Sequence, residues 1–137
     1  MPHDPARVAD TKAWMIKAAA DLRSGTHQMT AVPPNAGDAA FHAQQATEKS
    51  MKAFLTWHDV PFRKTHDLAN LGATCSDLDA SLLSVLQPSA ELTQYAWRYR
   101  YPGEPEEPPP DEVVAALATA RRVYDAILSR LPAEAHP

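Results

Sequence analysis

The sequence predicts an all-α fold, an up-and-down helical bundle of four to five helices. Four stretches repeat their apolar residues at steps of three and four, the spacing at which side chains share one side of a helix. No stretch alternates apolar and polar residues over enough positions to predict a strand. The length of 137 residues fits one domain, and we expect residues 1–137 to form it.

The first predicted helix covers residues 8–23. Within it, Trp14, Ala18 and Leu22 recur at four-residue spacing, which puts them on one side of the helix. The connection that follows, residues 24–37, is long for a link between two helices. Loops of that length are usually functional or mobile, and we expect the same here.

The second predicted helix covers residues 38–58. Asp38 is the expected N-cap, because an Asp side chain accepts hydrogen bonds from the free N–H groups that begin a helix. The helix must stop near Val60, since Pro61 disfavours helical backbone in the residue before it. A shorter helical piece is expected over residues 66–73.

The third predicted helix lies within residues 81–100, with a break at Pro88 as an open alternative. Its apolar stripe contains Leu92, Tyr95 and Tyr99. The last predicted helix, residues 111–131, has the most regular pattern of the four. The nine residues "PGEPEEPPP" (102–110) between these helices should form an extended, solvated linker that joins neither of them.

Composition excludes several classes of protein. The net charge of −4 argues against a protein whose main task is to coat nucleic acid, although it leaves room for a local basic site. Cys75 is the single cysteine, so neither an intramolecular disulfide nor a zinc site built from thiolates can form. The first residues lack the pattern of a secretory signal and no apolar run is long enough to cross a bilayer, so we expect a cytoplasmic protein.

The second predicted helix carries polar side chains in an ordered pattern. His42, Gln45, Lys49 and Lys52 fall on one side, opposite a broad apolar side. Two further polar residues of this helix, Gln44 and Glu48, intrude among the apolar positions and therefore need partners. The stripe is either a solvated face or a binding surface, and Glu48 has a favourable partner four residues on in Lys52.

Two further clusters carry candidate functional residues. In "FRKTHDL" (62–68), His66 can exchange protons or bind a metal, whereas Thr65 or Asp67 can instead cap a short helix. In "ELTQYAWRYRYPGE" (91–104), arginines stand beside aromatic residues. That combination suits phosphate binding and base stacking, and it suits a protein interface equally well.

A metal-dependent phosphohydrolase is a further alternative. His42, then His66 and Asp67, then Asp125 follow the order of metal ligands in the all-α HD-type phosphohydrolases. The dipeptide His-Asp occurs three times in this chain, so the pattern is weak. The sequence has no glycine-rich phosphate loop and no serine nucleophile motif, and we expect no cofactor and no metal.

Three blocks of sequence together resemble the HEPN domain family (higher eukaryotes and prokaryotes nucleotide-binding). They are "FHAQQATEKSMKAFL", "KTHDLANL" and "LTQYAWRYRYPGE", and the final helical segment "ARRVYDAILSRL" is similar to the family as well. The resemblance covers nearly the whole chain. It implies an up-and-down helical bundle that usually forms a homodimer. It also implies a minimal nucleotidyltransferase as partner in a toxin–antitoxin pair, and a nucleotide or RNA as ligand.

Many members of that family are metal-independent ribonucleases, which use an Arg, a polar residue, a few more residues and then a His. Arg98 and Arg100 stand where the resemblance puts the Arg, but acidic residues and prolines follow them, and the next histidine is His136. Such a nuclease needs a positioned His to move a proton. The resemblance thus favours a non-catalytic binding module, with a ribonuclease toxin that uses His66 or His42 as the alternative.

The positions that match the family blocks also supply the predicted ligand-binding residues. In the expected arrangement, Lys49 and Arg98 hold a phosphate, and His42 or His66 donates a hydrogen bond to it. Tyr95 or Tyr99 offers a ring face for stacking. The complete predicted set is His42, Gln45, Lys49, His66, Asp67, Arg98, Arg100 and Tyr101.

Overall fold

The computed structural model of the chain describes residues 2–103 and 106–137. It confirms the predicted all-α fold, since the described residues contain helices and no strand. The α-helices are α1 (Pro5–Gln28), α2 (Ala36–Trp57), α3 (Leu68–Leu78), α4 (Leu83–Leu86) and α5 (Pro110–Leu128). Three 3₁₀ helices accompany them: η1 (Ala80–Leu82), η2 (Gln87–Ala96) and η3 (Ala133–Ala135).

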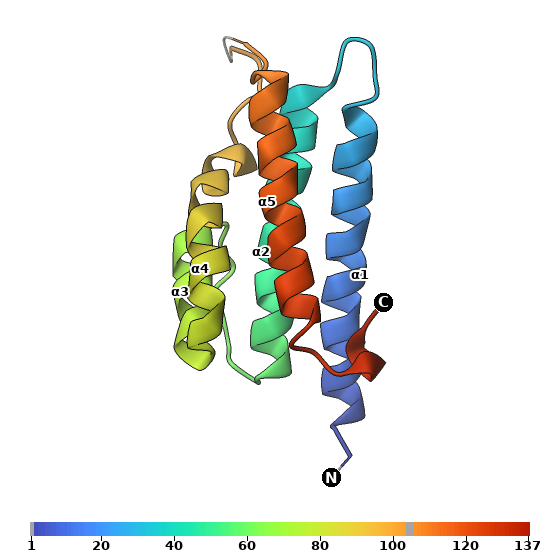
Figure 1. Cartoon of the computed structure of the whole chain (residues 1–137), viewed down its shortest axis with the longest axis vertical. Coiled ribbons are helices and arrows are strands. Elements are labelled where there is room, and N and C mark those ends of the chain that lie inside the picture. The colour runs from blue at the N-terminus through green and yellow to red at the C-terminus, as the bar shows by residue number, and fades with distance from the viewer. Residues whose placement is uncertain (1, 104–105) are drawn as a thin grey trace.

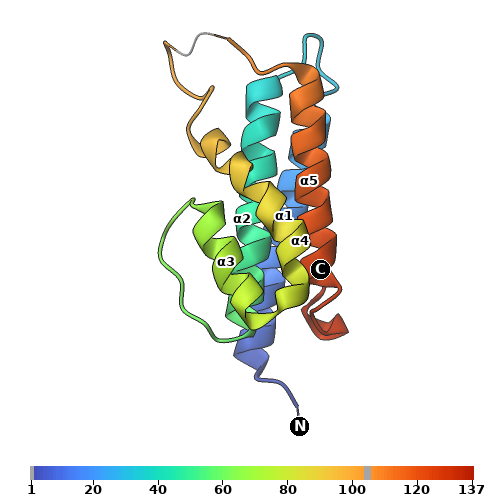
Figure 2. The same cartoon turned by 60° about the vertical axis from the view of Figure 1, so that its left-hand side comes forward.

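Three long helices, α1, α2 and α5, lie side by side along the length of the molecule (Figure 1). The shorter helices α3 and α4, with η2, pack on the other side of α2 from α1. Between α2 and α3, residues 58–67 climb back along α2, so that α2 and α3 run in the same direction (Figure 2). The chain therefore leaves the simple up-and-down order at this one connection.

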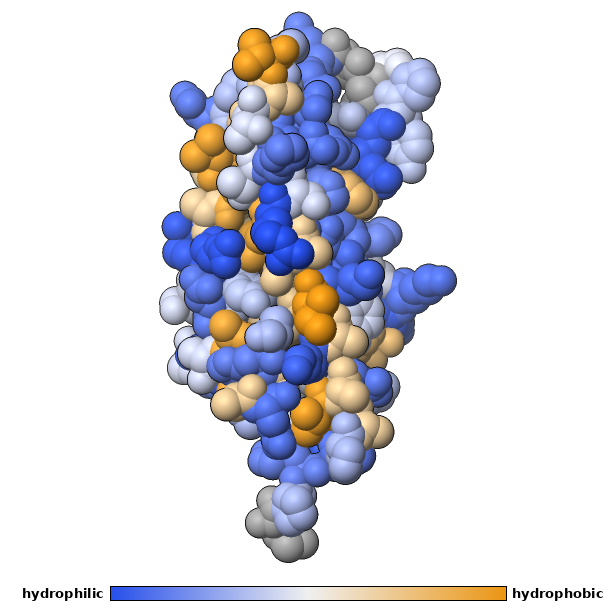
Figure 3. Space-filling view, turned by 90° about the vertical axis from the view of Figure 1, so that its right-hand side faces the viewer, coloured by the Kyte–Doolittle hydropathy of each residue, from blue (hydrophilic) through white to orange (hydrophobic). Residues whose placement is uncertain are grey.

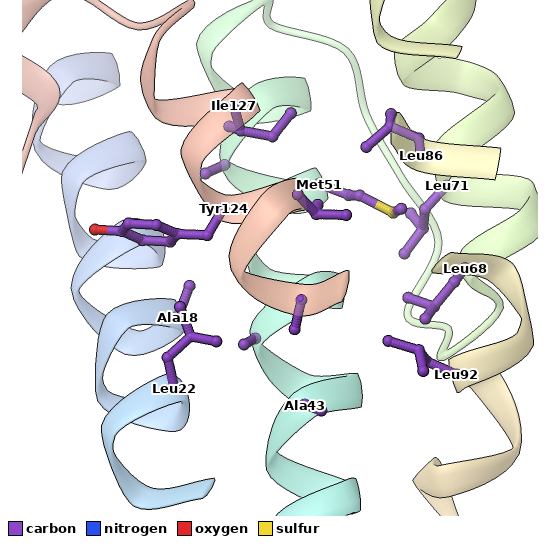
Figure 4. Close-up of a cluster of buried hydrophobic side chains, with 14 of the residues drawn as sticks. Ala18, Leu22, Ala43, Met51, Leu68, Leu71, Leu86, Leu92, Tyr124 and Ile127 are labelled. Atoms are coloured by element: carbon purple, nitrogen blue, oxygen red, sulfur yellow. The ribbon is translucent and has the colours of Figure 1, made fainter. Parts of the chain in front are cut away.

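The central helix is α2, which contacts α1, α5, α3 and η2. Of its 22 residues, 15 are buried, so no side of α2 is broadly exposed to solvent. Alanines on α2 let the neighbouring helices approach closely, and longer side chains fill the space on either side. Figure 4 shows Met51 extending from α2 toward Leu71 and Leu86, whereas Tyr124 of α5 extends toward α1; these residues belong to one buried cluster.

The first helix is longer at both ends than residues 8–23. Asp4 caps α1 by accepting a hydrogen bond from the N–H of Ala6 at 3.0 Å, and Pro5 is its first residue. At the other end α1 continues to Gln28, so the connection predicted over residues 24–37 shrinks to residues 29–35. A helical Gly25 is tolerated there because the packing of α1 requires a residue without a side chain.

The structure also corrects the predicted helix caps. Asp38 is not the N-cap of α2, because that helix already begins at Ala36 and Asp38 lies in its first turn. The N-cap position is Asn35, whose side chain instead donates to Oε1 of Gln28. By contrast, Asp67 caps α3 as one of the sequence alternatives predicted, accepting from the N–H of Asn70 at 3.2 Å.

The helix predicted within residues 81–100 is largely a 3₁₀ helix. Only the four residues of α4 are α-helical, and η2 then ends at Ala96. Pro88 lacks an N–H group and favours a change of helical geometry at that point. Beyond η2 the chain turns sharply, and Tyr99 has a φ of 69°, in the left-handed region that side chains disfavour.

The linker predicted over residues 102–110 is less independent than expected. Pro110 is the first residue of α5 and Pro108 is buried, so the linker does join the helix that follows it. Residues 104 and 105 of the predicted linker lie outside the described residues. Of the helices in the described part of the chain, none combines the length and the apolar composition that crossing a bilayer requires.

Gly25 provides the first test of this packing. A Cβ atom on residue 25 would lie 2.7 Å from Cδ2 of Leu117, 3.2 Å from Cβ of His42 and 3.3 Å from the carbonyl oxygen of Ala39. We therefore expect Gly25→Leu to lower the free energy of unfolding by about 1–3 kcal/mol, measured by urea denaturation. The control is Ala9→Leu on the exposed side of α1. Equal stability of the two variants would contradict the close packing of α1.

Candidate functional site

The polar stripe of α2 meets α1 at a buried carboxylate, Asp21. Oδ1 of Asp21 lies 2.9 Å from Nδ1 of His42, and Oδ2 accepts a hydrogen bond from Nζ of Lys49 at 2.7 Å. Asp21 is only 8% exposed, and the side chains of His42 and Lys49 are mostly covered as well. These two predicted ligand-binding residues therefore join α1 to α2 through Asp21.

A second polar network surrounds Glu48 in the middle of α2. Oε1 of Glu48 accepts from Nε2 of Gln44 at 3.0 Å and lies 2.6 Å from Nδ1 of His66. Its other oxygen, Oε2, accepts from Nζ of Lys52 at 2.9 Å. Gln45 extends the network, since its Nε2 donates to Oε1 of Gln44 at 2.7 Å. The two intruding residues, Gln44 and Glu48, thus form hydrogen bonds with each other and with three neighbouring residues.

The environment of Glu48 keeps its carboxylate charged. Burial by itself raises the pKa of Glu48, but hydrogen bonds from Lys52, His66 and Gln44 outweigh burial and hold this pKa below its usual 4.5. Lys52 is itself buried, with Nζ 5.7 Å from the ring centre of Trp14 and 5.6 Å from that of Phe62. Of the two alternatives for this stripe, a solvated face is therefore wrong for Lys52, because α1 and the segment before α3 cover it.

His66 connects this buried network to solvent. Its Nδ1 is held by Glu48, whereas 57% of its side chain is exposed. A carboxylate at Nδ1 favours a proton on that nitrogen, which leaves the lone pair of the neutral ring on Nε2. Asp67, the next residue, is committed to capping α3. The predicted pair His66 and Asp67 consequently divides into one exposed imidazole and one structural carboxylate.

The remaining predicted residues lie just after η2, on what we call the arginine–aromatic surface. It consists of Trp97, Arg98, Arg100 and Tyr101, all of them exposed. The two rings are 53% and 60% exposed, respectively, which is unusual for aromatic side chains of this size. The residue between the arginines, Tyr99, is partly buried.

Both arginines of this surface are supported by neighbours. Nη1 of Arg98 donates to Oε1 of Gln94 at 2.6 Å, and its guanidinium lies 4.7 Å from the ring centre of Tyr99. The guanidinium of Arg100 lies 3.8 Å from the ring centre of Phe41 on α2. Within residues 2–103 and 106–137, neither arginine forms an ion pair with a carboxylate. Arg100 also donates from Nη1 to the carbonyl oxygen of Ala96 at 2.9 Å, so the neighbours that hold both arginines carry no negative charge.

The structure separates the residues of the metal hypothesis. His42 contacts Asp21, His66 contacts Glu48, and Asp67 caps α3. Among the described residues, no group of three or more His, Cys, Asp or Glu side chains is arranged to hold a metal ion. The order of His and Asp residues along the chain is therefore not matched by a cluster in space.

A broad apolar interface is absent from the face that α1 covers. In Figure 3 the apolar residues on this face stand singly among polar ones. Scattered apolar residues of this kind are normal on a protein surface and do not indicate a docking site.

Cys75 offers no surface chemistry either, since burial raises the pKa of its thiol to about 12.

Two important residues were not singled out from the sequence. Asp21 stands three residues after Ala18, at a position of the first helix that should face the core, and a carboxylate there signals a buried partner. Glu107 has no such signal, because it lies in a run of prolines and glutamates. Its carboxylate nonetheless accepts a hydrogen bond from the N–H of Gly37, a residue seventy positions earlier in the chain.

Comparison with known proteins yields one match. A family model described as HEPN domain matches residues 11–131, which includes every residue of the two polar networks and of the arginine–aromatic surface. No curated protein and no solved structure matches the chain.

The Glu48 network predicts a specific pH dependence of stability. Because the pKa of Glu48 is lower in the folded state, its contribution is present above about pH 4.5 and is lost as pH falls through the lowered folded pKa. We expect Glu48→Gln to be less stable than wild type at pH 7 by about 3–5 kcal/mol, since Lys52 loses its buried partner. Chemical denaturation from about pH 7 to pH 3 should show this difference shrinking. In the control, Glu91→Gln at an exposed site, stability should follow wild type at every pH.

Proposed function

The chain belongs to the HEPN domain family, and we propose that it binds the phosphates of a nucleotide or of single-stranded RNA on the arginine–aromatic surface. The observation that carries this proposal is the exposure of Arg98 and Arg100 beside two exposed rings, with no carboxylate paired to either arginine among the described residues. Guanidinium groups bind phosphate oxygens through paired hydrogen bonds, and aromatic rings stack on bases.

The negative net charge of the chain means that a polyanion is attracted to local basic surfaces and not to the molecule as a whole. At a net charge of −4, most of the molecule repels a polyanion, so phosphate is attracted only where positive charge is unpaired. Several other basic groups are already committed: Lys52 to Glu48, Lys49 to Asp21 and Arg130 to Asp79. The arginines after η2 differ from these groups because their neighbours are uncharged: rings, the amide of Gln94 for Arg98 and the carbonyl oxygen of Ala96 for Arg100.

Only some of the predicted ligand-binding residues take part in the proposed site. Arg98, Arg100 and Tyr101 form the direct contacts, with Trp97 added to them. Gln45 lies one turn after Phe41 on α2 and so adjoins the ring on which Arg100 stacks. His42 and Lys49 stay predicted residues that the proposal does not use, since Asp21 already binds the imidazole of His42 and the ammonium group of Lys49.

We also propose a homodimer and a nucleotidyltransferase partner. Both follow from the family resemblance, in which such proteins pair with a minimal nucleotidyltransferase in toxin–antitoxin systems. Two exposed rings beside two arginines support a protein-binding role for the same surface, because Trp, Tyr and Arg are enriched in interfaces. Light scattering of the protein alone and mixed with the product of the neighbouring gene measures both associations.

The binding proposal is tested by removing the two arginines together. We expect Arg98→Ala/Arg100→Ala to weaken binding of a labelled single-stranded RNA by about 100-fold or more, because two charged hydrogen bonds are lost and each contributes about 1.5–3 kcal/mol. Fluorescence anisotropy at several salt concentrations measures this, and the salt dependence should become shallower in the variant.

The matched control removes the same charge elsewhere. Arg121→Ala/Arg122→Ala changes two exposed arginines of α5 and should leave the affinity close to wild type. Equal losses in the two double variants would mean that only net charge matters. Full affinity in Arg98→Ala/Arg100→Ala would place the ligand elsewhere on the molecule.

A ribonuclease that uses His66 is the second candidate, and one observation favours it. Glu48 holds Nδ1 of His66 at 2.6 Å while most of the ring is exposed, an arrangement in which a carboxylate orients a histidine for proton transfer. In such a reaction Nε2 accepts the proton of a ribose 2′-hydroxyl, whose oxygen attacks the adjacent phosphorus. The leaving 5′-oxygen takes its proton from water.

RNA cleavage in the presence of a metal chelator tests this candidate. The wild-type protein should cut a labelled RNA, and His66→Asn should not, because the amide cannot accept the proton. His27→Asn, at an exposed position of α1, is the control and should retain full activity. Intact RNA after incubation with the wild-type protein would rule out the nuclease and leave the binding proposal unaffected.

A further inference from the structure

The chain that carries the arginine–aromatic surface is attached to the start of α2 at two points. The first is the stacking of Arg100 on the ring of Phe41. The second is the hydrogen bond from the N–H of Gly37 to Oε2 of Glu107, at 2.5 Å. These contacts lie one turn apart on α2, and they hold the chain on both sides of Tyr101.

Gly37 makes room for this attachment. A Cβ atom on residue 37 would lie 2.8 Å from Oε2 of Glu107 and 2.9 Å from Cβ of Tyr99. The carbonyl oxygen of Tyr99 would be only 3.3 Å away, so the backbone itself closes the space. Only glycine therefore allows the segment after η2 to lie this close to α2.

Tyr99 adopts a conformation that needs support from its surroundings. Its φ of 69° is in the left-handed region, which is unfavourable for a residue with a side chain. Such a conformation persists only where neighbouring contacts hold it. Here the backbone of Gly37 lies against Tyr99, and the arginines before and after Tyr99 stack on rings.

Glu107 also fills a role that the N-cap residue of α2 leaves open. Asn35 makes no side-chain hydrogen bond to the first turn, because its amide donates to Gln28. The carboxylate of Glu107 accepts from the N–H of Gly37 in that turn and also opposes the positive end of the helix dipole. An otherwise exposed glutamate is thus fixed in one position by α2.

A cleft of about 410 Å³ opens where these contacts meet. It is lined by Gln28, Asn35, Asp38, Tyr99, Arg100 and Glu107. The same cleft therefore contains an arginine of the arginine–aromatic surface and the glutamate that anchors the chain after it. A change in the contact between Glu107 and Gly37 alters the wall from which Arg100 meets a ligand.

We infer that Gly37 and Glu107 are positioning residues for the arginine–aromatic surface, an inference that rests on the proposed phosphate binding. The hydrogen bond between them orders the chain around Arg98, Arg100 and Tyr101 before a ligand arrives. Binding then carries a smaller cost for ordering side chains and backbone. Glu107 therefore favours the binding of an anion although it is itself negatively charged.

Charge alone predicts the opposite effect of Glu107. Removing a carboxylate near two arginines reduces repulsion of phosphate and should strengthen binding. Glu106 is the matched comparison, because it is exposed, lies next in sequence and forms no side-chain hydrogen bond to α2 among the described residues. Glu106→Ala and Glu107→Ala change the net charge equally, so a difference in the sign of their effects isolates the positioning role.

The experiment measures affinity for the same labelled single-stranded RNA in three variants. Glu107→Ala should bind about five-fold more weakly than wild type. In this variant the segment is ordered only when RNA binds, so the entropic cost of ordering it reduces the binding free energy. Glu106→Ala should bind as tightly as wild type or more tightly. Glu107→Gln retains an oxygen that can accept from Gly37 and should restore binding close to wild type. Thermal unfolding, recorded in parallel, shows that each variant is folded at the temperature of the binding assay.

Hydrogen exchange separates failure of this inference from failure of the proposed function. Faster exchange at residues 97–103 in Glu107→Ala than in Glu106→Ala, together with weaker RNA binding, supports the positioning role. Tighter binding by both alanine variants, or unchanged binding by Glu107→Ala, overturns it. If wild type binds neither RNA nor nucleotide, the proposed function fails and the inference fails with it, while the exchange data still show whether Glu107 orders this chain.

Discussion

The structure depends on the burial of a charged carboxylate, Glu48, in the middle of its central helix. A buried carboxylate is costly unless hydrogen bonds and an opposite charge compensate it, and here Gln44, Lys52 and His66 do so. Lys52 is available from the same helix, but His66 must come from outside α2. The chain therefore climbs back along α2 after residue 58, which makes α3 run parallel to α2 (Figure 2). The position of η2, and with it that of the arginine–aromatic surface, follows from this connection, because Thr93 of η2 accepts from the N–H of Leu68 at the start of α3.

The polar residues of α2 mostly form hydrogen bonds in the interior of the molecule. Asp21 holds His42 and Lys49 of α2 against α1. Glu48 of α2 holds His66, which lies in the segment before α3. An acidic group between two helices fixes their register more specifically than apolar contacts alone, because hydrogen bonds require particular atoms at particular distances. Polar chemistry that remains open to solvent is then found where the regular helices end, at His66 and after η2. This division is consistent with a protein of negative net charge that has a small proposed site for phosphate.

Two glycines set the distances between the elements that carry the polar networks and the arginine–aromatic surface. Gly25 lets α1 lie close to α2 and α5, and Gly37 lets the segment around Tyr99 lie against the first turn of α2. In both places the atoms nearest to a missing Cβ belong to another part of the chain. The close approach at Gly37 also explains how Glu107, in a stretch rich in proline and glutamate, obtains a defined partner. Proline limits the conformations of that stretch before folding, so less freedom is lost when Glu107 is fixed.

The sequence by itself determined the helical fold, the approximate extent of α2 and α5, the HEPN family and the pairing of Glu48 with Lys52. These are local properties, carried by apolar spacing and by residues one helical turn apart. Only the tertiary structure decided which polar side chains are covered, because periodicity shows which residues share a side of a helix and not which element packs there. Asp21 of α1 bonds to His42 and Lys49 of the neighbouring helix α2. Glu107 bonds to Gly37, which lies seventy residues earlier in the chain. Such partners are chosen by the path of the whole chain, and no spacing within one helix records that path.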